Sequence, residues 1–438
     1  MSVITHRSVL AVAVPIMLSN VSEPLIGVVN TAVLGQLPEP YYIGAITVGS
    51  LIFSFLFWGF GFLRLSTGGL SAQATGAGDT PELIAVLARA LGIAVAAGLV
   101  LIILSPLIGK FVFDLMGGSA EVRHHAEIYY NYRIWSAPFA LANYCFIGWF
   151  IGQGRSVLTF AVQLVLNLTN MGLSILFVMG FGMTSAGVGL AALLAEVTAS
   201  ILGLAFVLVS LRRMNGHVSW PAILDGRKFW RTLAMNGDIM IRTLCLVFAF
   251  SWMTARGARQ GDIILAGNTI LLHFFGLSAF LIDGFAYASE ALVGQAVGAR
   301  SRERFWRSIR LTSFWAAVVG VTCAVIIWLT GPWLIDLMSV NPEVRETARR
   351  FLPWCVLTPI LGAASFQFDG IYSGAMATKE MRNMMIVSLA IFLAAWWLLE
   401  TRFGNHGLWA ALNIFFVARG LTFASRMPSL ERRAFQAL

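Results

Sequence analysis

The hexapeptide Ala72-Gln73-Ala74-Thr75-Gly76-Ala77 returns in the second half of the chain as Gly294-Gln295-Ala296-Val297-Gly298-Ala299, a spacing of 222 residues. The same spacing carries two further matches: Asp114-Leu115-Met116 onto Asp336-Leu337-Met338, and Glu121-Val122-Arg123 onto Glu343-Val344-Arg345. Three short matches at one spacing indicate that this chain of 438 residues is two copies of one unit. Internal repeats of this kind are typical of secondary transporters, which bind their substrate between the copies.

The composition indicates a membrane-embedded fold. Hydrophobic residues make up 58% of the chain, charged residues only 12%, and the mean hydropathy is +0.79. Soluble domains are near a quarter charged. About twelve apolar runs reach the roughly 20 residues that a helix needs to cross a bilayer. They are residues 8–35, 41–75, 83–113, 124–151, 156–181, 185–211, 229–255, 262–298, 308–335, 344–374, 381–401 and 406–425. No run alternates with the two-residue period of a barrel strand. We therefore predict an all-α polytopic membrane protein.

A charged stretch near the midpoint predicts the domain boundary. It divides the chain into an N-terminal lobe, residues 1–211, a linker, residues 212–228, and a C-terminal lobe, residues 229–438. Each lobe then holds six spans. Because six is even, both lobes start and end on the same side of the membrane. The two copies are therefore expected to be parallel, related by a pseudo-twofold axis along the membrane normal.

The net charge of +9 suggests a nucleic-acid partner, but the positions of the basic residues argue against one. Most short-loop Lys and Arg fall in alternate loops, for example Arg212, Arg213, Arg227, Lys228, Arg231, Arg300, Arg302, Arg304, Arg307 and Arg310. This asymmetry follows the positive-inside rule. It predicts cytoplasmic termini and no role in nucleic-acid binding.

Three carboxylates of the second lobe are candidates for carrying a coupling ion. Asp283 and Glu290 lie seven residues apart in one apolar run, so they share a helix face, roughly 10 Å apart along the axis. Asp369 lies in Phe366-Gln367-Phe368-Asp369-Gly370. Ionisable groups inside spans are functional by default, and a desolvated carboxylate can load and release H⁺ or Na⁺. The alternative is a structural cluster held by hydrogen bonds or an arginine.

The first lobe carries polar residues in a helical stripe. Gln163, Asn167, Asn170 and Ser174 follow the spacing i, i+4, i+7, i+11 on an apolar helix. Such a stripe either holds helices together or lines a cavity. Glu23 stands beside Pro24, where the helix is expected to bend, on one face with Asn30. It is a further candidate ion site, with an outer-leaflet surface position as the alternative.

The arginines inside spans are expected to be structural. Asp238 lies four residues before Arg242, a spacing that predicts an ion pair. Arg64 and Arg133 are expected to pair with carbonyls or with Glu196. The four cysteines lie singly in apolar runs, and the sequence has neither a phosphate-binding loop nor a metal-ligand spacing. We therefore expect neither enzyme activity nor a cofactor or metal.

Several of these segments, taken together, resemble the multidrug and toxic compound extrusion (MATE) family, in its DNA-damage-inducible, DinF-like subfamily. The segments that carry the resemblance span nearly the whole chain: 15–20, 27–35, 62–73, 283–290, 294–300, 366–370 and 379–383. The resemblance implies a monomeric antiporter of the bacterial cytoplasmic membrane, surrounded by lipid. It would export amphipathic or cationic small molecules through a central cavity that opens to alternate sides, driven by H⁺ or Na⁺.

The resemblance also assigns residues. The expected cavity set is Asn20, Asn30, Gln163, Asn167, Asn170, Ser174, Tyr287 and Gln367. The family usually has Asp where this chain has Asn30, and often where it has Ser174, whereas Asn170 matches the family. Because neither replacement titrates, coupling is expected to rest on Glu290 and Asp369, with Asp283 and Glu23 as further candidates.

Two other functions compete with this prediction. A flippase for a lipid-linked precursor, from the same superfamily, would be expected to have extra spans and several cations in its cavity. A sensor or membrane enzyme would require an intramembrane catalytic pair or a soluble domain, and the sequence suggests neither.

Overall fold

The protein is described by a computed structural model. It places residues 4–37, 39, 41–116, 119–214 and 220–435. Within these ranges, 12 helical segments are long and apolar enough to cross a membrane. They match the predicted runs one for one, so the all-helical class and the twelve spans are confirmed. The central residues of the predicted linker, 215–219, lie outside the described residues.

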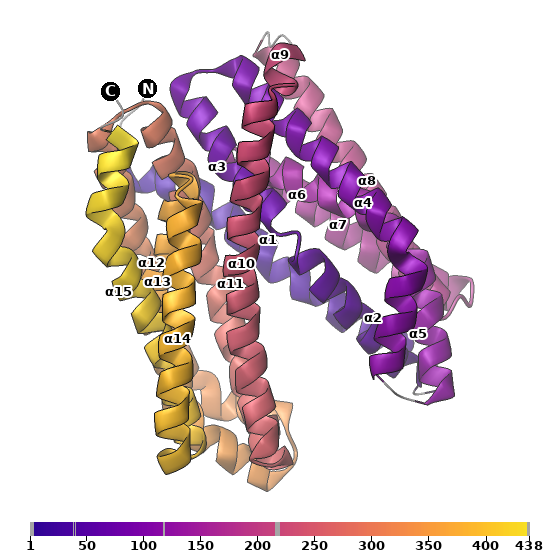
Figure 1. Cartoon of the computed structure of the whole chain (residues 1–438). Coiled ribbons are helices and arrows are strands. Elements are labelled where there is room, and N and C mark those ends of the chain that lie inside the picture. Colours follow the sequence, from indigo (N-terminus) through magenta and orange to yellow (C-terminus); the bar gives the residue numbers. More distant parts are fainter. Residues whose placement is uncertain (1–3, 38, 40, 117–118, 215–219, 436–438) are drawn as a thin grey trace. The chain divides into compact units, whose positions relative to one another are not determined.

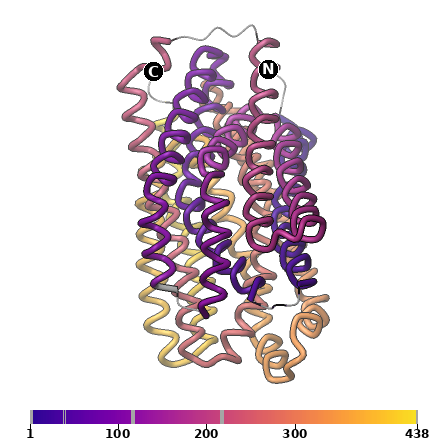
Figure 2. Tube along the Cα trace, turned by 90° about the vertical axis from the view of Figure 1, so that its right-hand side faces the viewer, coloured from indigo at the N-terminus to yellow at the C-terminus, as the bar shows by residue number. Residues whose placement is uncertain are grey.

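The chain forms two compact units, Leu18–Thr232 and a second unit that joins Met1–Met17 to Leu233–Leu438. Helices of the first half are α1 His6–Leu34, α2 Tyr41–Trp58, α3 Phe62–Ala77, α4 Thr80–Met116, α5 Ala120–Arg133, α6 Ala137–Gly152, α7 Ser156–Ile175 and α8 Ser185–Arg213. Those of the second half are α9 Trp220–Ile223, α10 Gly226–Arg259, α11 Asp262–Gly298, α12 Arg302–Met338, α13 Pro342–Gly374, α14 Thr378–Phe403 and α15 Asn405–Phe435. Figures 1 and 2 show α10 to α15 running alongside one another.

The contact-based units differ from the predicted lobes at two places. Residues 229–232, predicted to begin the second lobe, fall in the first unit. The first 17 residues, which include the start of α1, pack with the second unit instead of the first. Ile4, for example, accepts a hydrogen bond at its carbonyl from Arg307 Nε at 2.6 Å. The predicted domain boundaries otherwise stay a prediction. α1 continues as helix through Pro24, and the bend expected there also stays a prediction.

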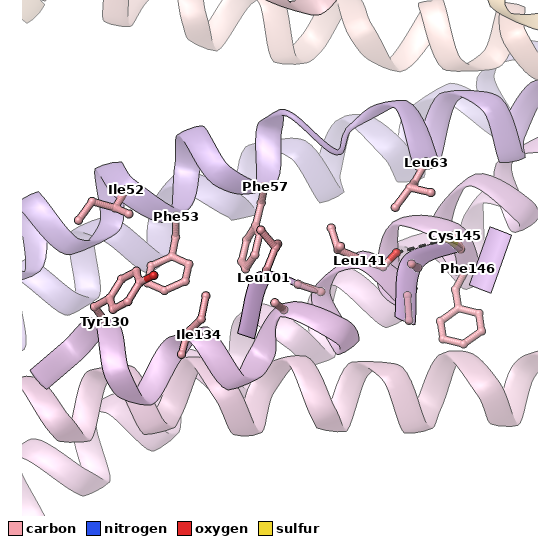
Figure 3. Close-up of a cluster of buried hydrophobic side chains, with 14 of the residues drawn as sticks. Ile52, Phe53, Phe57, Leu63, Leu101, Tyr130, Ile134, Leu141, Cys145 and Phe146 are labelled. Carbon is pink, nitrogen blue, oxygen red and sulfur yellow. Dashed lines mark hydrogen bonds between the residues drawn. The ribbon is translucent and has the colours of Figure 1, made fainter. Parts of the chain in front are cut away.

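The first unit has an apolar core in which aromatic side chains of α2 meet those of α5 (Figure 3). The rings of Phe53 and Tyr130 lie 5.5 Å apart, and Tyr130 donates a hydrogen bond to the Ser105 carbonyl at 3.0 Å. The second unit has an aromatic core of its own, in which Phe275 and Phe416 lie 5.3 Å apart. Because lipid is as apolar as these side chains, close packing rather than water exclusion holds such cores together.

Backbone geometry repeats at the spacing found in the sequence. Six of the seven described positions with positive φ form three pairs separated by 222 residues: Gly78 (69°) and Arg300 (52°), Gly154 (73°) and Met376 (54°), Gly182 (68°) and Gly404 (54°). The seventh, Gly261 (119°), has no such counterpart. Helix caps follow the same rule. The side chains of Asp79 and Ser301 cap α4 and α12, and those of Ser119 and Asn341 cap α5 and α13. These turns and caps confirm the duplication locally, since the paired chain reversals use the same device twice.

Close helix crossings repeat as well. A methyl group at Gly148 or Gly152 would collide with the α3 backbone at Arg64 or Gly68. The equivalent crossing in the second unit brings Gly370 and Gly374 against the α11 backbone at Ala286 and Glu290. Every one of these positions is displaced by 222 residues between the units. Small residues at these crossings allow the two backbones to touch.

Candidate functional site

The α11–α13 crossing brings three predicted residues of the second unit to neighbouring levels. Gly370 faces the backbone of Ala286, and Gly374 faces that of Glu290, one turn further along α11. Asp369, next to Gly370, therefore lies near the level of Ala286, between Asp283 and Glu290. Glu290 is fully buried and Asp369 is 7% exposed, whereas Asp283 is half-buried. Tyr287, also half-buried, stands on the same α11 face as Asp283 and Glu290.

Asp369 is held by two arginines from different helices. Its Oδ2 accepts from Arg419 Nη2 of α15 at 2.5 Å and also forms an ion pair with Arg242 of α10. In the described part of the chain, Oδ1 is buried and has no hydrogen-bond partner. The three groups together carry one excess positive charge. Asp283 lies within electrostatic range of Arg419 and offsets that charge.

Arg419 was missed by the sequence analysis. Its side chain is completely buried, and its guanidinium lies 5.5 to 5.7 Å from the ring centres of Phe366, Phe415 and Phe416. Cation–π contacts of this kind stabilise a desolvated guanidinium. The signal was present in the sequence, since Arg419 is a charged residue inside the last apolar run.

The predicted ion pair between Asp238 and Arg242 is wrong. Asp238 instead accepts from Arg382 Nη1 at 2.6 Å and from Thr378 Oγ1 at 3.0 Å, both on α14. Arg242 turns to Asp369. A spacing of four residues places two side chains on one helix face, but it does not decide whether neighbouring helices offer better partners.

Gln367 lies in the same helix as Asp369 but points to another partner. Its Nε2 donates to Thr312 Oγ1 of α12 at 2.5 Å, and the residue is 3% exposed. Its contact joins α12 to α13 inside the second unit, a packing role that leaves its predicted place in a cavity untested.

The polar stripe of the first unit holds helices together at one end. Gln163 Nε2 donates to Asn167 Oδ1 at 3.1 Å, and Asn167 Nδ2 donates to Ser22 Oγ of α1 at 2.6 Å. Further along, the side-chain oxygens of Asn30, Asn170 and Ser174 are buried. Among the described residues these oxygens have no hydrogen-bond partner.

The hydrogen bond between Asn167 and Ser22 places these two residues at the same depth, so the depths of other polar residues on α1 and α7 can be compared. The first and fifth spans run in the same direction because consecutive spans alternate. Asn30 lies about 12 Å beyond Ser22, and Ser174 about 10 Å beyond Asn167, at the 1.5 Å rise of a helix. The two positions where the family usually has Asp therefore lie at similar depth. Asn20 is half-buried on α1, and Glu23 is exposed on the same helix.

The first unit contains a second acidic centre that the sequence analysis gave no role in ion coupling. Glu196 Oε2 accepts from Asn143 Nδ2 at 2.7 Å, and Asn143 Oδ1 accepts from Ser200 Oγ at 2.9 Å. Glu196 lies within electrostatic range of Glu23 and Arg133. Arg133 donates to the Tyr129 hydroxyl, and no ion pair with Glu196 is formed in the described residues.

A small hollow of about 220 Å³ lies beside the turn between α3 and α4 in the first unit. Gly78, Asp79, Gln153 and Arg155 are among its lining residues. Burial and the nearby charge of Arg213 lower the pKa of Arg155 from its usual value. None of the predicted site residues lines this hollow, so it does not coincide with the predicted substrate site.

Equivalent positions in the two units show which charged groups belong to the shared fold and which occur in one unit alone. The exposed ion pair Asp114–Arg123, 2.8 Å long, has its counterpart in Asp336–Arg345 at 3.7 Å. The charged cluster of the second unit has no counterpart of that kind. At a spacing of 222, Arg242, Glu290, Asp369 and Arg419 correspond to Asn20, Gly68, Ile147 and Val197. The packing of the ancestral unit therefore does not require these charges.

A duplicated bundle of twelve apolar helices, with charged groups in its interior, is the architecture of a multipass membrane protein. The MatE family model matches residues 15–176 and 239–396, more than half of the chain. The chain therefore belongs to the multidrug and toxic compound extrusion (MATE) family, and the resemblance found in its sequence is confirmed.

Individual relatives agree with this assignment. DNA damage-inducible protein F of Escherichia coli is 37% identical over 94% of this chain and 90% of its own length. The multidrug export protein MepA of Staphylococcus saprophyticus is 19% identical over 91% of this chain and 88% of its own length. An outward-facing structure of a multidrug resistance MATE transporter superposes with a TM-score of 0.88, at 18% identity, over 97% of this chain and 96% of the other. A transporter of the same superfamily from Pyrococcus furiosus, described as having a binding pocket of reverse polarity, gives 0.88 at 16% identity over 98% and 96%.

Proposed function

We propose that this protein is an antiporter that exports amphipathic or cationic small molecules by alternating access, driven by H⁺ or Na⁺. Family membership supports transport. Relatives that are named for multidrug export support the substrate class. The buried carboxylates Glu290 and Asp369 are proposed to carry the coupling ion, with Asp283 and Glu23 as further candidates.

The single observation behind the ion-carrying role is the charged cluster that only the second unit has. A buried charge is expensive inside a membrane and is kept where function uses it. Glu290 replaces the glycine found at the equivalent position 68, and Asp369 replaces an isoleucine. Because the first unit folds in the same way without them, scaffolding does not explain these carboxylates.

In the first unit, Asn30 and Ser174 are proposed to bind substrate and not to carry the ion. Asn30 and Ser174 lie at similar depth and cannot change charge between states. A coupling group must bind its ion differently on the two sides of the membrane. The buried oxygens of Asn30, Asn170 and Ser174 can instead accept hydrogen bonds from a substrate. Asn20, Gln163, Asn167, Tyr287 and Gln367 complete the proposed substrate set.

The proposal is tested in proteoliposomes under a pH gradient and a Na⁺ gradient imposed separately. Glu290→Gln and Asp369→Asn keep the shape of each side chain and remove its charge. Each is expected to abolish efflux of a fluorescent cation such as ethidium, because the ion then has no carboxylate to bind. Asn30→Ala is expected to weaken efflux while its ion dependence persists.

Asp336→Asn is the matched control, because Asp336 is an exposed acidic residue of the same lobe, paired with Arg349. It should retain coupled efflux. If both second-lobe variants keep full coupled transport and Glu23→Gln loses it, the ion is carried at α1 and this assignment fails. The protein is also proposed to be a monomer, and size-exclusion chromatography with light scattering tests this.

A flippase for an anionic, lipid-linked precursor is the second candidate. The two buried guanidiniums of Arg242 and Arg419 favour it, because such groups bind phosphate well. Ethidium efflux and the translocation of a fluorescent isoprenoid diphosphate separate the two functions. Translocation of the diphosphate without ethidium efflux would select the flippase.

A further inference from the structure

Asp369, the proposed ion carrier, is already occupied by cations that belong to the protein. Arg242 and Arg419 both bind the same oxygen, Oδ2. They come from α10 and α15, two helices well separated in sequence from each other and from Asp369. The two guanidiniums therefore neutralise the carboxylate, as a bound H⁺ or Na⁺ would otherwise do.

We propose that Arg242 and Arg419 are tethered counter-ions of Asp369, and that Arg242 leaves the carboxylate when the coupling ion binds. This inference rests on the proposed function and deepens it. The ion and Arg242 would then occupy Asp369 alternately, so that the carboxylate is neutralised at every stage of the cycle.

Charge balance explains why one arginine has to leave. A third cation beside Asp369 would face two guanidiniums within a few ångströms. In the low dielectric of the lobe interior that repulsion is several times stronger than in water. An uncompensated buried charge is also strongly destabilising. Exchange of one cation for another avoids both costs.

The packing of the two arginines indicates which one leaves. Arg419 is wholly buried and surrounded by three phenylalanine rings, so it is fixed by its environment. The Arg242 side chain is 12% exposed. Its helix, α10, is joined to the rest of the unit by long polar side chains at three levels. These are Asp238 with Arg382, Arg242 with Asp369, and Arg256 with Glu400.

The other charged groups near Asp369 are compatible with this exchange. On α11, Asp283 lies within electrostatic range of Arg419. Glu290 lies against Gly374, one helical turn beyond the contact between Gly370 and Ala286. The α12 side chain near α13 at this level is the uncharged Thr312. From α14, Arg382 is engaged by Asp238. When Arg242 leaves, Asp283 remains to offset the charge of Arg419.

The test is the ion concentration that gives half-maximal ethidium efflux in proteoliposomes of the full chain. Na⁺ is varied at fixed pH in one arm, and pH is varied without Na⁺ in the other. Arg242→Gln removes a competing cation and should lower the required concentration of the coupling ion roughly tenfold or more. Ion binding by the purified protein is measured alongside, because it does not depend on completed transport.

Arg256→Gln is the matched control. It removes another α10 arginine that is paired with a buried carboxylate, Glu400, away from Asp369. It should leave the half-activation concentration unchanged. Combining Arg242→Gln with Asp369→Asn should eliminate the gain in ion affinity, because the shared carboxylate charge is then gone. If Arg242→Gln fails to insert, Arg242→Lys should show a smaller shift in the same direction.

The outcomes separate this inference from the function on which it rests. If the wild-type protein binds neither H⁺ nor Na⁺ and its efflux depends on neither, both the inference and the proposed function are wrong. An ion-dependent wild type whose folded Arg242 variant needs the same ion concentration overturns the tethered counter-ion alone. A shift of equal size in Arg256→Gln does so too, because the effect would then be a general consequence of loosening α10.

Discussion

Arg419 illustrates how the second unit accommodates a charge in its interior. The guanidinium cannot lose its proton, so it requires both a counter-charge and a polarisable surrounding. Asp369 provides the first, and the rings of Phe366, Phe415 and Phe416 provide the second. Removing this residue would leave Asp369 with one partner and open a void among the rings.

We predict that Arg419→Met destabilises the protein by about 3 kcal/mol, the range found when one partner of a buried ion pair is removed. Thermal unfolding in detergent measures this loss. Arg302→Gln is the control, because Arg302 forms an exposed pair with Glu431 and should cost less than about 1 kcal/mol. Equal unfolding temperatures for Arg419→Met and the wild type would show that the aromatic cage tolerates a neutral side chain.

At the scale of the element, the α11–α13 crossing depends on glycine. The α13 backbone approaches α11 so closely at Gly370 that a side chain there would meet the Ala286 carbonyl. Asp369 is the adjacent residue, so the depth of the crossing also sets the position of the carboxylate relative to its arginines.

Gly370→Ala is expected to push the two helices apart. Overpacking of this kind costs about 1 to 3 kcal/mol, and it should also reduce coupled efflux by displacing Asp369. Gly276→Ala on α11 is the matched control, since an added methyl group there has open space. That variant should be neutral or slightly stabilising. Comparable losses in the two variants would indicate a general intolerance of α11 and α13 to substitution, not a contact at the crossing.

At the scale of the whole molecule, the two units share a scaffold and differ in their interior charges. Caps, left-handed turns, glycine crossings and the exposed Asp–Arg pair recur at a spacing of 222 residues. The buried cluster around Asp369 does not recur. Two units with the same packing therefore differ in the charges that they bury.

The topology of the whole chain gives a separate prediction. The excess of basic residues in alternate loops predicts that both termini lie in the cytoplasm. Green fluorescent protein fused to the C-terminus should fluoresce, because it folds in the cytoplasm. Alkaline phosphatase fused after Phe403, in the loop between the last two spans, should be active. The opposite pattern of reporter activity would invert the orientation.

The sequence by itself determined the class, the twelve spans and the repeat. Each rests on local information, because hydropathy over about 20 residues decides whether a helix can span a bilayer. A shared ancestry leaves the same turn and cap residues at one spacing. The family followed from short motifs for the same reason. The carboxylates Glu290 and Asp369 were also visible in the sequence, since any charge inside an apolar run is conspicuous.

Only the tertiary structure decided which charges meet. Arg242 pairs with Asp369, which is 127 residues away in the chain, and not with Asp238, which is four residues away on its own helix. Asp238 binds α14 instead, and Arg419 completes the group from α15. Pairing inside a membrane depends on which helices are neighbours and at what depth. Those relations arise from packing between segments far apart in sequence, which periodicity within one helix does not contain.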